Sequence, residues 1–480
     1  MHVEPSTFAS ATEMLYALRG KKISAVELIE LHLQQIERYN PQLNAVVTLE
    51  AEMARKAAFD ADQARARGEA KPLLGLPVTV KDCIDVAGMK CTGGVVPDRV
   101  PERDAPIIAK ARAAGIVFMG KTNVPPWAAD CQSGNELFGV ANNPWDQTRT
   151  PGGSSGGSAA ALASGMTPLE FGGDFAGSIR VPAAFCGVYG HRPSESALST
   201  IGHFPGKNVP LPGTVMPVMG PMARSAEDLR LAFDVVAGPE IGEDVAWRLE
   251  LPPARHQRLQ DFRVAMMPPV DWLPVDHEIV QAQTELGEAL RRLGATVKTV
   301  QPEGFDDLCD HHSLAVSLMA ALTGPPEKGE LEQIAESSYP FSDAYVRGKE
   351  GSADSYFGLL YQREMVRQAY RAFFHSWDVL ITPANVVNAF PHQEIRPISP
   401  LDTRTLVIDD QTVPYWYQDI YAVLSNVSGQ PATAFPVGQT QLGLPIGLQA
   451  IGPYLEDYTP IHFAGLVEQE FGGFHKPAGF

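Results

Sequence analysis

Residues 152–163 read GGSSGGSAAALA, and this stretch decides how the chain around it folds. Its four glycines allow the backbone to turn sharply and to approach another segment closely. The alanine-rich run that follows is typical of a helix, and the first backbone amides of that helix would point back toward the turn. The sequence therefore predicts a tight turn that opens directly into a helix.

Three other interpretations fit a stretch rich in glycine and serine. A phosphate-binding loop would need a Gly-Lys-Ser or Gly-Lys-Thr ending, which is missing here. A flexible linker is disfavoured by the buried character of both flanks. Residues 153–157 also match a nucleophile elbow centred on Ser155, but that motif needs a preceding strand and a later histidine base. Residues 142–147 read NNPWDQ, which is typical of a loop, and none of the later histidines stands in a distinctive setting.

Helical and strand patterns alternate along the rest of the chain. We expect a helix at 25–40, which a Ser24–Glu27 capping box opens and Asn40-Pro41 ends. Further helices are expected at 51–67 and at 277–293, the latter with Gly294 as its cap, and strands at 74–80, 262–266 and 295–300. Residues 105–118 should form a helix followed by a strand that ends at Phe118. This alternation predicts an α/β protein with a mostly parallel or mixed sheet. Residues 301–375 read as mostly helical and polar, as in a cap over the site. Nothing divides the chain, so we expect one large domain.

Composition narrows the class of protein. The formal charge of −18 disfavours phosphate backbones and anionic membranes as partners. Five cysteines without a C-x-x-C spacing argue against a disulfide framework or a zinc site. The first residues lack a basic start followed by an apolar stretch, and no apolar run approaches the length needed to span a bilayer. Cytoplasmic residence is therefore the default expectation.

Four ordered motifs carry a family resemblance. They are GLPVTVKD at 75–82, the glycine and serine turn at 152–158 together with GDFAGSIRVPA at 173–183, GPMARS at 220–225 and GLPIGLQ at 443–449. With them the chain resembles the amidase signature family, including its stand-alone members similar to aryl acylamidase and fatty acid amide hydrolase. The resemblance implies a large mixed central β-sheet covered by helices on both faces. It also implies a single amidase domain over residues 1–480, with a signature core at about 74–228 and a helical cap at about 301–375.

The resemblance also implies a catalytic triad. A serine hydroxyl is a weak nucleophile that needs a base, and no histidine lies in these motifs. Lys81 would be the base if burial keeps it neutral. It would act through Ser154, held by a cis peptide bond, on the nucleophile Ser178. Backbone amides of Phe175, Ala176 and Gly177, with that of Ser178, would form the oxyanion hole. No metal or cofactor is expected.

Other residues are expected to support the site. Ser155 would hydrogen-bond within the turn, and Asp174 and Arg180 would pair and brace the loop. His191 is expected to be structural. The family commonly has Thr-Gly-Gly-Ser at 175–178, so Phe175 and Ala176 would change the pocket shape.

A substrate wall is expected in the loop that follows residue 122. It resembles the acyl-side wall of stand-alone family members, and Trp127, Ala128 and Asp130 are its candidate binding residues. Core packing explains these residues equally well. Trp127 and the small residues after it indicate an apolar pocket.

We therefore expect an amidase that hydrolyses the C–N bond of a small apolar or aryl amide through an acyl-enzyme. Its partner would be a small-molecule amide, without nucleic acid or membrane, and a homodimer is a candidate assembly. The alternative is the glutaminase component of a tRNA-dependent amidotransferase, which shares the triad. That component typically carries a Tyr-Tyr-Asp-rich stretch, whereas residues 356–364 read YFGLLYQRE.

Overall fold

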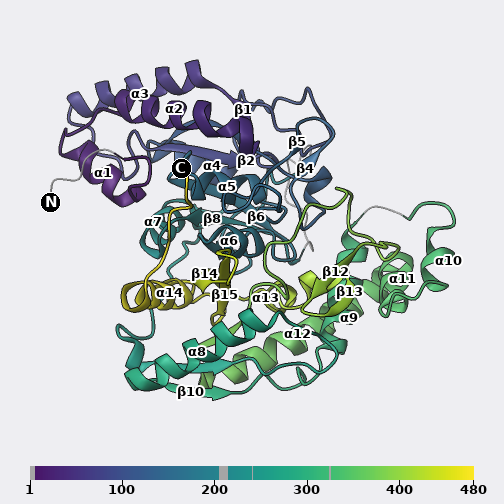
Figure 1. The fold of residues 1–480 in the computed structure, drawn as a ribbon. Helices are drawn as coiled ribbons and strands as arrows, with labels where there is room; N and C mark the ends of the chain where they lie inside the picture. The colour runs from purple at the N-terminus through teal and green to yellow at the C-terminus, as the bar shows by residue number, and fades with distance from the viewer. Residues whose placement is uncertain (1–5, 205–214, 240–241, 324–325) are drawn as a thin grey trace.

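The sheet at the centre of the protein has 11 strands in the order β1-β3-β2-β6-β8-β7-β14-β15-β11-β9-β10 (Figure 1). The computed structural model describes residues 6–204, 215–239, 242–323 and 326–480. The strands are β1 Val46–Leu49, β2 Pro77–Lys81, β3 Val117–Thr122, β6 Leu169–Asp174, β7 Tyr189–Arg192, β8 Val218–Ala223, β9 Arg263–Met266, β10 Thr296–Thr299, β11 Val379–Pro383, β14 Ala432–Gln439 and β15 Pro445–Ile451. β2 pairs in parallel with β3 and β6, and β9 with β10 and β11, while the other pairs are antiparallel. The sheet is mixed, as the sequence predicts.

Helices cover both faces of this sheet. They are α1 Ala11–Arg19, α2 Ala25–Leu43, α3 Ala51–Ala66, α4 Pro106–Ala113, α5 Gly156–Ala163, α6 Arg180–Cys186, α7 Ala226–Val236, α8 His277–Leu293, α9 Cys309–Leu322, α10 Glu330–Ala335, α11 Ser342–Glu350, α12 Ala353–Ser376, α13 Val423–Ser428 and α14 Tyr458–Phe471. Adjacent residues of β14 show the two sides. Ala434 packs in one cluster with Ala183 of α6, while Phe435 packs in another with Phe463 of α14. Neighbouring strand residues point to opposite faces, so α6 and α14 lie on opposite sides.

Several predicted boundaries agree with the structure. The Ser24–Glu27 capping box is present at the start of α2, and Gly294 ends α8 in the left-handed region at φ 102°. The prediction that Asn40-Pro41 ends the helix that begins at residue 25 is wrong. α2 continues through Pro41 to Leu43, and Asn44, at φ 48°, closes it by donating its N–H to the Asn40 carbonyl.

The strand predicted to end at Phe118 is also longer than expected. β3 runs from Val117 to Thr122 because it has a partner on each side, with Thr122 opposite both Val46 of β1 and Lys81 of β2. Pairing on both sides satisfies backbone groups that a sequence pattern cannot assign.

Residues 301–375 contain the four helices α9 to α12 and the loops around them, and 324–325 lie outside the described residues. α9 packs against α11, α12 and α13, and its apolar face contributes Leu314, Ala315 and Leu318 to a cluster against which Phe175 and Ala176 pack. This region therefore contacts the loop that precedes Ser178. Its role as a cap stays a prediction.

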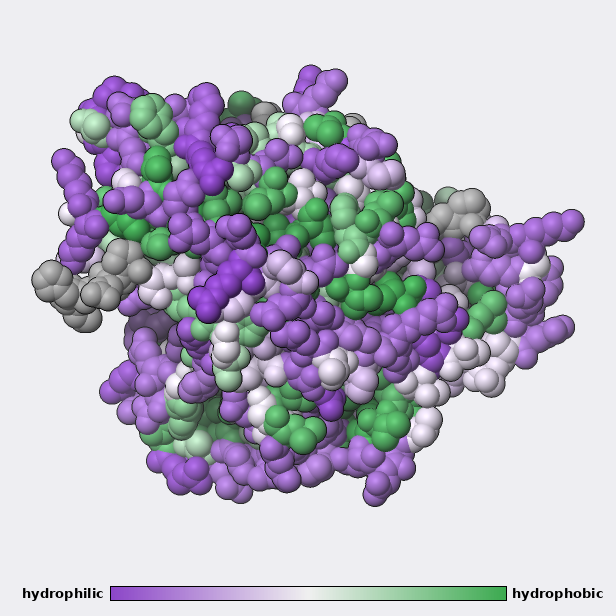
Figure 2. Space-filling model, turned by 45° about the horizontal axis from the view of Figure 1, so that its top comes forward, coloured by the Kyte–Doolittle hydropathy of each residue, from purple (hydrophilic) through white to green (hydrophobic). Residues whose placement is uncertain are grey.

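The face of the molecule in Figure 2 is mostly hydrophilic, and its apolar side chains form separate groups. A second, smaller sheet consists of β12 Thr405–Ile408 and β13 Gln411–Pro414, which form an antiparallel hairpin. Among the described residues, no helix combines the length and apolar character that a membrane crossing requires.

Candidate active site

Lys81 is the last residue of β2, and every residue of that strand is buried. Its Nζ lies 2.7 Å from the Ser154 Oγ and donates a hydrogen bond of 3.1 Å to the Gly173 carbonyl oxygen. The side chain is fully buried. The flanking strands β3 and β6 thus hold an amine beside a serine hydroxyl in a place from which water is excluded.

The electrostatics at Lys81 favour the neutral amine. Burial lowers the pKa of Lys81, and it outweighs the opposing effects of Cys83 and Asp174. Asp82 does not contribute, because its carboxylate accepts hydrogen bonds from Thr92 and lies 3.7 Å from the Nζ of Lys121. Adjacent strand residues point to opposite faces, as expected from the sequence. A neutral amine can accept a proton, which is the property a general base needs.

The turn that carries Ser154 is tightly packed. The peptide bond between Gly153 and Ser154 is cis. A Cβ atom at Gly153 would collide with the carbonyl oxygens of Asp130 and Gln132, so this position requires glycine. The Ser133 hydroxyl also lies 3.3 Å from the Ser154 carbonyl oxygen, to which it donates a hydrogen bond. The loop at 130–133 therefore holds the turn from one side.

Of the three serines near the lysine, Ser178 is the accessible one. Ser154 and Ser155 are buried, whereas Ser178 is partly exposed, just before α6. The Ser155 N–H donates a 3.1 Å hydrogen bond to the Ser178 carbonyl, and the Ser155 hydroxyl donates a 3.4 Å bond to that of Gly173. Ser155 thus has a supporting position inside the turn, and a substrate can reach Ser178.

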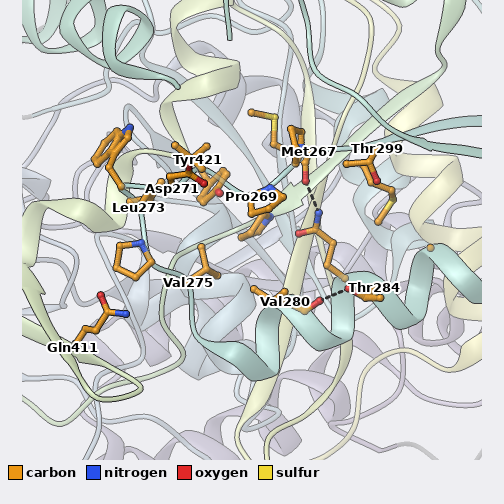
Figure 3. Close-up of a pocket in the computed structure, with 18 of the residues that line it drawn as sticks. Met267, Pro269, Asp271, Leu273, Val275, Val280, Thr284, Thr299, Gln411 and Tyr421 are labelled. Atoms are coloured by element: carbon orange, nitrogen blue, oxygen red, sulfur yellow. Dashed lines mark hydrogen bonds between the residues drawn. The ribbon is translucent and has the colours of Figure 1, made fainter. Parts of the chain in front are cut away.

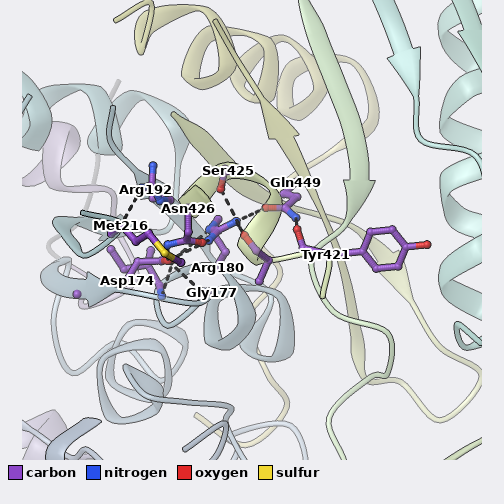
Figure 4. Close-up of polar contacts among 12 residues, drawn as sticks. Asp174, Gly177, Arg180, Arg192, Met216, Tyr421, Ser425, Asn426 and Gln449 are labelled. Atoms are coloured by element: carbon purple, nitrogen blue, oxygen red, sulfur yellow. Dashed lines mark hydrogen bonds and ion pairs between the residues drawn. The ribbon is translucent and has the colours of Figure 1, made fainter. Parts of the chain in front are cut away.

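Asp174 and Arg180 form a fully buried ion pair that braces the loop between them (Figure 4). The Asp174 carboxylate accepts from the Arg180 guanidinium at 2.9 and 3.0 Å and from the backbone N–H groups of Gly177 and Ile179 at 2.9 and 3.2 Å. Burial by itself would raise the pKa of Asp174, but the charge and hydrogen bonds of Arg180 hold it well below its usual range. One carboxylate therefore fixes the backbone on both sides of Ser178.

This bracing changes the expected oxyanion hole. The Gly177 N–H already donates to Asp174. Of the four amides expected as donors, those of Phe175, Ala176 and Ser178 have no hydrogen-bond acceptor assigned within the described part of the chain. They are the better candidates for stabilising an oxyanion.

The expected substrate wall is more polar than the sequence indicates. Trp127 is half-exposed, and Ala128 packs against the main core. The Asp130 side chain is fully buried, with its carboxylate 2.8 Å from an Arg404 nitrogen and accepting a 2.9 Å hydrogen bond from the Tyr415 hydroxyl. The three residues therefore lie in different surroundings.

His191 occupies a structural position away from these groups. It is buried on β7, with Nδ1 2.9 Å from the Thr433 hydroxyl and Nε2 3.2 Å from the Asp457 carboxylate. Its ring packs edge-on against Phe233.

Asp419 is a further candidate residue that the sequence reasoning missed. Burial raises its pKa to about 7, and its Oδ1 has no hydrogen-bond partner among the described residues. It lies three positions before Ala422, which packs directly against Gly177, the residue before Ser178. The Nε2 atom of His312 is 4.0 Å away, and burial lowers the pKa of that imidazole to about 3. An acidic residue just after the aromatic run at 415–417 is the only sequence signal for this position.

A pocket of about 440 Å³ lies elsewhere, between residues 266–275 and α8 (Figure 3). Gln283 and Thr284 of that helix line it and donate to the carbonyls of Met267 and Val280. Its lining includes none of the triad residues. It is therefore separate from the candidate active site.

A buried lysine beside a serine hydroxyl, next to an accessible serine on a braced loop, defines an enzyme that hydrolyses carbon–nitrogen bonds of amides. The chain belongs to the amidase signature family, whose family model, described as Amidase, matches residues 27–460. The expected amidase signature fold is thereby confirmed.

Similar proteins span almost the whole chain. The A subunit of glutamyl-tRNA(Gln) amidotransferase from Dechloromonas aromatica (strain RCB) is 32% identical over 498 residues, which cover 96% of this chain and 97% of the relative. The protein of the same name from Carboxydothermus hydrogenoformans (strain ATCC BAA-161 / DSM 6008 / Z-2901) is 30% identical over 500 residues, with 98% of each chain covered. A solved structure from a vestigial protein complex that reveals the evolutionary origins of an s-triazine catabolic enzyme has a TM-score of 0.80 at 27% identity, and the match covers 98% of this chain and 100% of that one.

These relatives correct one expectation. The sequence predicts a small-molecule amide as the partner, no nucleic acid, and a homodimer as the candidate assembly. This prediction is wrong. The relatives are named as subunits of an amidotransferase whose name includes a tRNA, and the solved structure comes from a protein complex. They favour the alternative function over the small apolar or aryl amide.

Proposed function

We propose that this chain is the amide-hydrolysing component of an amidotransferase-type assembly and that it releases ammonia from glutamine. The observation that carries the proposal is the unpartnered carboxylate oxygen of Asp419, three positions before Ala422, which packs against Gly177 of the Ser178 loop. The similarity to amidotransferase subunits over nearly the full length supports it.

In this proposal Lys81, Ser154 and Ser178 move one proton between them. Neutral Lys81 accepts the proton of the Ser154 hydroxyl, and Ser154 accepts that of Ser178, whose oxygen attacks the amide carbonyl. The amides of Phe175, Ala176 and Ser178 stabilise the oxyanion. Ammonia leaves with the proton returned through Ser154, and water then hydrolyses the acyl-enzyme.

Asp419 favours a donor that carries a positive charge. A carboxylate that is nearly removed from water is costly unless a cation or hydrogen-bond donors satisfy it. Burial lowers the pKa of His312 to about 3, so this neighbour stays neutral and does not compensate the charge. The α-ammonium group of glutamine would supply the missing partner. A neutral aryl or alkyl amide would not.

A partner polypeptide of the assembly would use the ammonia. Residues 356–364 lack the Tyr-Tyr-Asp-rich pattern expected of glutamine-specific subunits, so recognition of glutamine in this chain rests on Asp419.

The test is ammonia release by the purified full-length chain. Glutamine is compared with its analogue that lacks the α-amino group, and with an acetanilide. We expect kcat/KM for glutamine to exceed that for the analogue by about 10- to 100-fold, the worth of a hydrogen bond to a charged group. Ser178→Ala serves as the inactive control. Faster turnover of the acetanilide than of glutamine would overturn the proposal.

A further inference from the structure

The loop at residues 129–133, called here the wall loop, is bound along its length by a segment more than 250 positions later in the chain. This segment, residues 391–415, carries the β12–β13 hairpin and is called the hairpin segment. The Ile398 N–H donates to the Ala129 carbonyl at 2.8 Å, and the Gln393 N–H donates to the Gln132 side-chain oxygen at 2.9 Å. The two segments are thus joined at both ends of the wall loop.

A buried ion pair connects their centres. The Arg404 guanidinium lies 2.8 Å from the Asp130 carboxylate, and the two side chains are 5% and 0% exposed. Arg404 also pairs with Asp402 at 2.6 Å and lies over the Tyr415 ring at 3.9 Å. The Tyr415 hydroxyl donates to the other oxygen of Asp130 at 2.9 Å. Arg404 is therefore held on several sides in one orientation.

The other side of the wall loop faces the catalytic turn. The carbonyls of Asp130 and Gln132 lie so close to Gly153 that no Cβ atom fits there. The Ser133 hydroxyl donates to the carbonyls of Gly152 and Ser154 at 3.1 and 3.3 Å and accepts from the Gly156 N–H at 2.9 Å. A displacement of the wall loop would therefore move Ser154.

We propose that Arg404 is a positioning residue for catalysis, which sets the place of the Ser154 hydroxyl between Lys81 and Ser178 through Asp130 and the wall loop. Arg404 touches none of the reacting atoms. The inference rests on the proposed roles of Lys81, Ser154 and Ser178, but not on glutamine as the substrate. Catalysis depends steeply on such placement, because a shift of about 1 Å at reacting groups can cost about 10²-fold in rate.

The test uses Arg404→Met and, because that change leaves the Asp130 charge buried without its partner, the double variant Asp130→Asn/Arg404→Met, which removes that charge as well. In both variants Asp402 keeps its ion pair with Arg396 at 3.0 Å. Both are made in the full-length chain. The readouts are the rate at which a fluorophosphonate labels Ser178, the kcat and KM for amide hydrolysis, and the melting temperature. Arg255→Met is the matched control, because Arg255 also pairs with carboxylates, the buried one of Asp378 and the partly buried one of Glu456, but outside the wall loop.

We expect labelling and kcat to fall about 10²-fold in both Arg404 variants while KM changes little. Arg404→Lys should recover part of the rate, because it keeps the charge but lacks the fork that reaches both Asp130 and Asp402. Arg255→Met should label at the wild-type rate. Wild-type labelling by the folded double variant would overturn the positioning role and leave the proposed function intact. If the wild-type protein is not labelled at Ser178, both the positioning role and the proposed function are refuted.

Discussion

The Nζ atom of Lys81 lies 2.7 Å from the Oγ atom of Ser154, although the two residues are 73 positions apart. The other hydrogen-bond partner of the amine within the described chain is the carbonyl of Gly173. A carbonyl and a hydroxyl accept hydrogen bonds from an ammonium group but carry no charge to balance it. Burial therefore lowers the pKa of Lys81, against the opposing effects of nearby acidic groups.

Removing the base should slow catalysis and change its pH dependence. We expect Lys81→Ala to lower kcat by roughly 10²–10⁴-fold, the usual worth of a general base. For the glutamine analogue without the α-amino group, whose binding does not depend on Asp419, the wild-type pH profile of kcat/KM should have an acidic limb between about pH 6 and 8.5, because Lys81 must lose its proton, and the variant should lack it. Lys56→Ala is the control, since Lys56 is exposed and pairs with Asp60. Near-full activity of Lys81→Ala with the same acidic limb would refute the assignment.

A buried carboxyl group should tune that limb. Burial raises the pKa of Glu170 to about 7. The hydrogen bonds from Thr79 and other nearby hydroxyl groups, and the charge of Lys121, oppose this rise. Once ionised, Glu170 raises the pKa of Lys81. Glu170→Gln removes this charge at similar size, so the acidic limb should move to lower pH. The measurement is kcat/KM against pH for the two proteins. A limb that stays in place, or moves to higher pH, would show that Glu170 does not act on Lys81.

The accessible serine should be the nucleophile. Ser178→Ala should abolish turnover because no acyl-enzyme can form. Ser155→Ala should keep the acyl-enzyme route, because Ser155 is buried and its hydroxyl is directed to the Gly173 carbonyl. Mass spectrometry after fluorophosphonate treatment should find the label on Ser178. A label on Ser155 would instead support the nucleophile elbow.

Much of the fold, and the contact between Lys81 and Ser154, could be predicted because the signals are local. In the turn at 152–158 and in the segment 173–183, glycines and the start of a helix are enough to predict the local backbone conformation. The capping box at Ser24 and the glycine after α8 mark helix ends in the same way. Even the opposite orientations of Lys81 and Asp82 follow from strand alternation.

The missed features depend on residues that are far apart in the sequence. The sequence places Asp130 in an apolar substrate wall, but its partner Arg404 lies 274 positions away, and no local pattern joins them. The Gly177 amide is a different case, because its acceptor Asp174 lies only three positions away and the contact depends on how the loop closes. The raised pKa of Asp419 results from burial, which only the tertiary structure imposes.

The Asp174–Arg180 ion pair should make a large contribution to the free energy of unfolding. Arg180→Met leaves the Asp174 charge buried without its partner, which costs about 3–5 kcal/mol. The folded-state pKa of Asp174 lies below its unfolded value, so this stabilisation is present above about pH 4 and is lost as the pH falls. Urea unfolding at neutral and acidic pH measures both effects. Arg258→Met, which removes an exposed pair with Asp261, should change the free energy of unfolding by at most about 0.5 kcal/mol. Equal losses in the two variants would contradict the prediction.

The last prediction concerns recognition of the substrate by Asp419. Asp419→Asn keeps the size of the side chain but removes its charge, so the KM for glutamine should rise about 10- to 100-fold. The KM for the analogue without the amino group should change little. Because the pKa of Asp419 is about 7 and only the carboxylate attracts a cation, the wild-type KM for glutamine should fall as the pH rises through that value. In Asp419→Asn this dependence should disappear, while the limb of kcat that belongs to Lys81 remains. Separate loss of the two pH effects would distinguish binding from chemistry. An equal rise in KM for glutamine and the analogue would show that Asp419 shapes the pocket without binding the ammonium group.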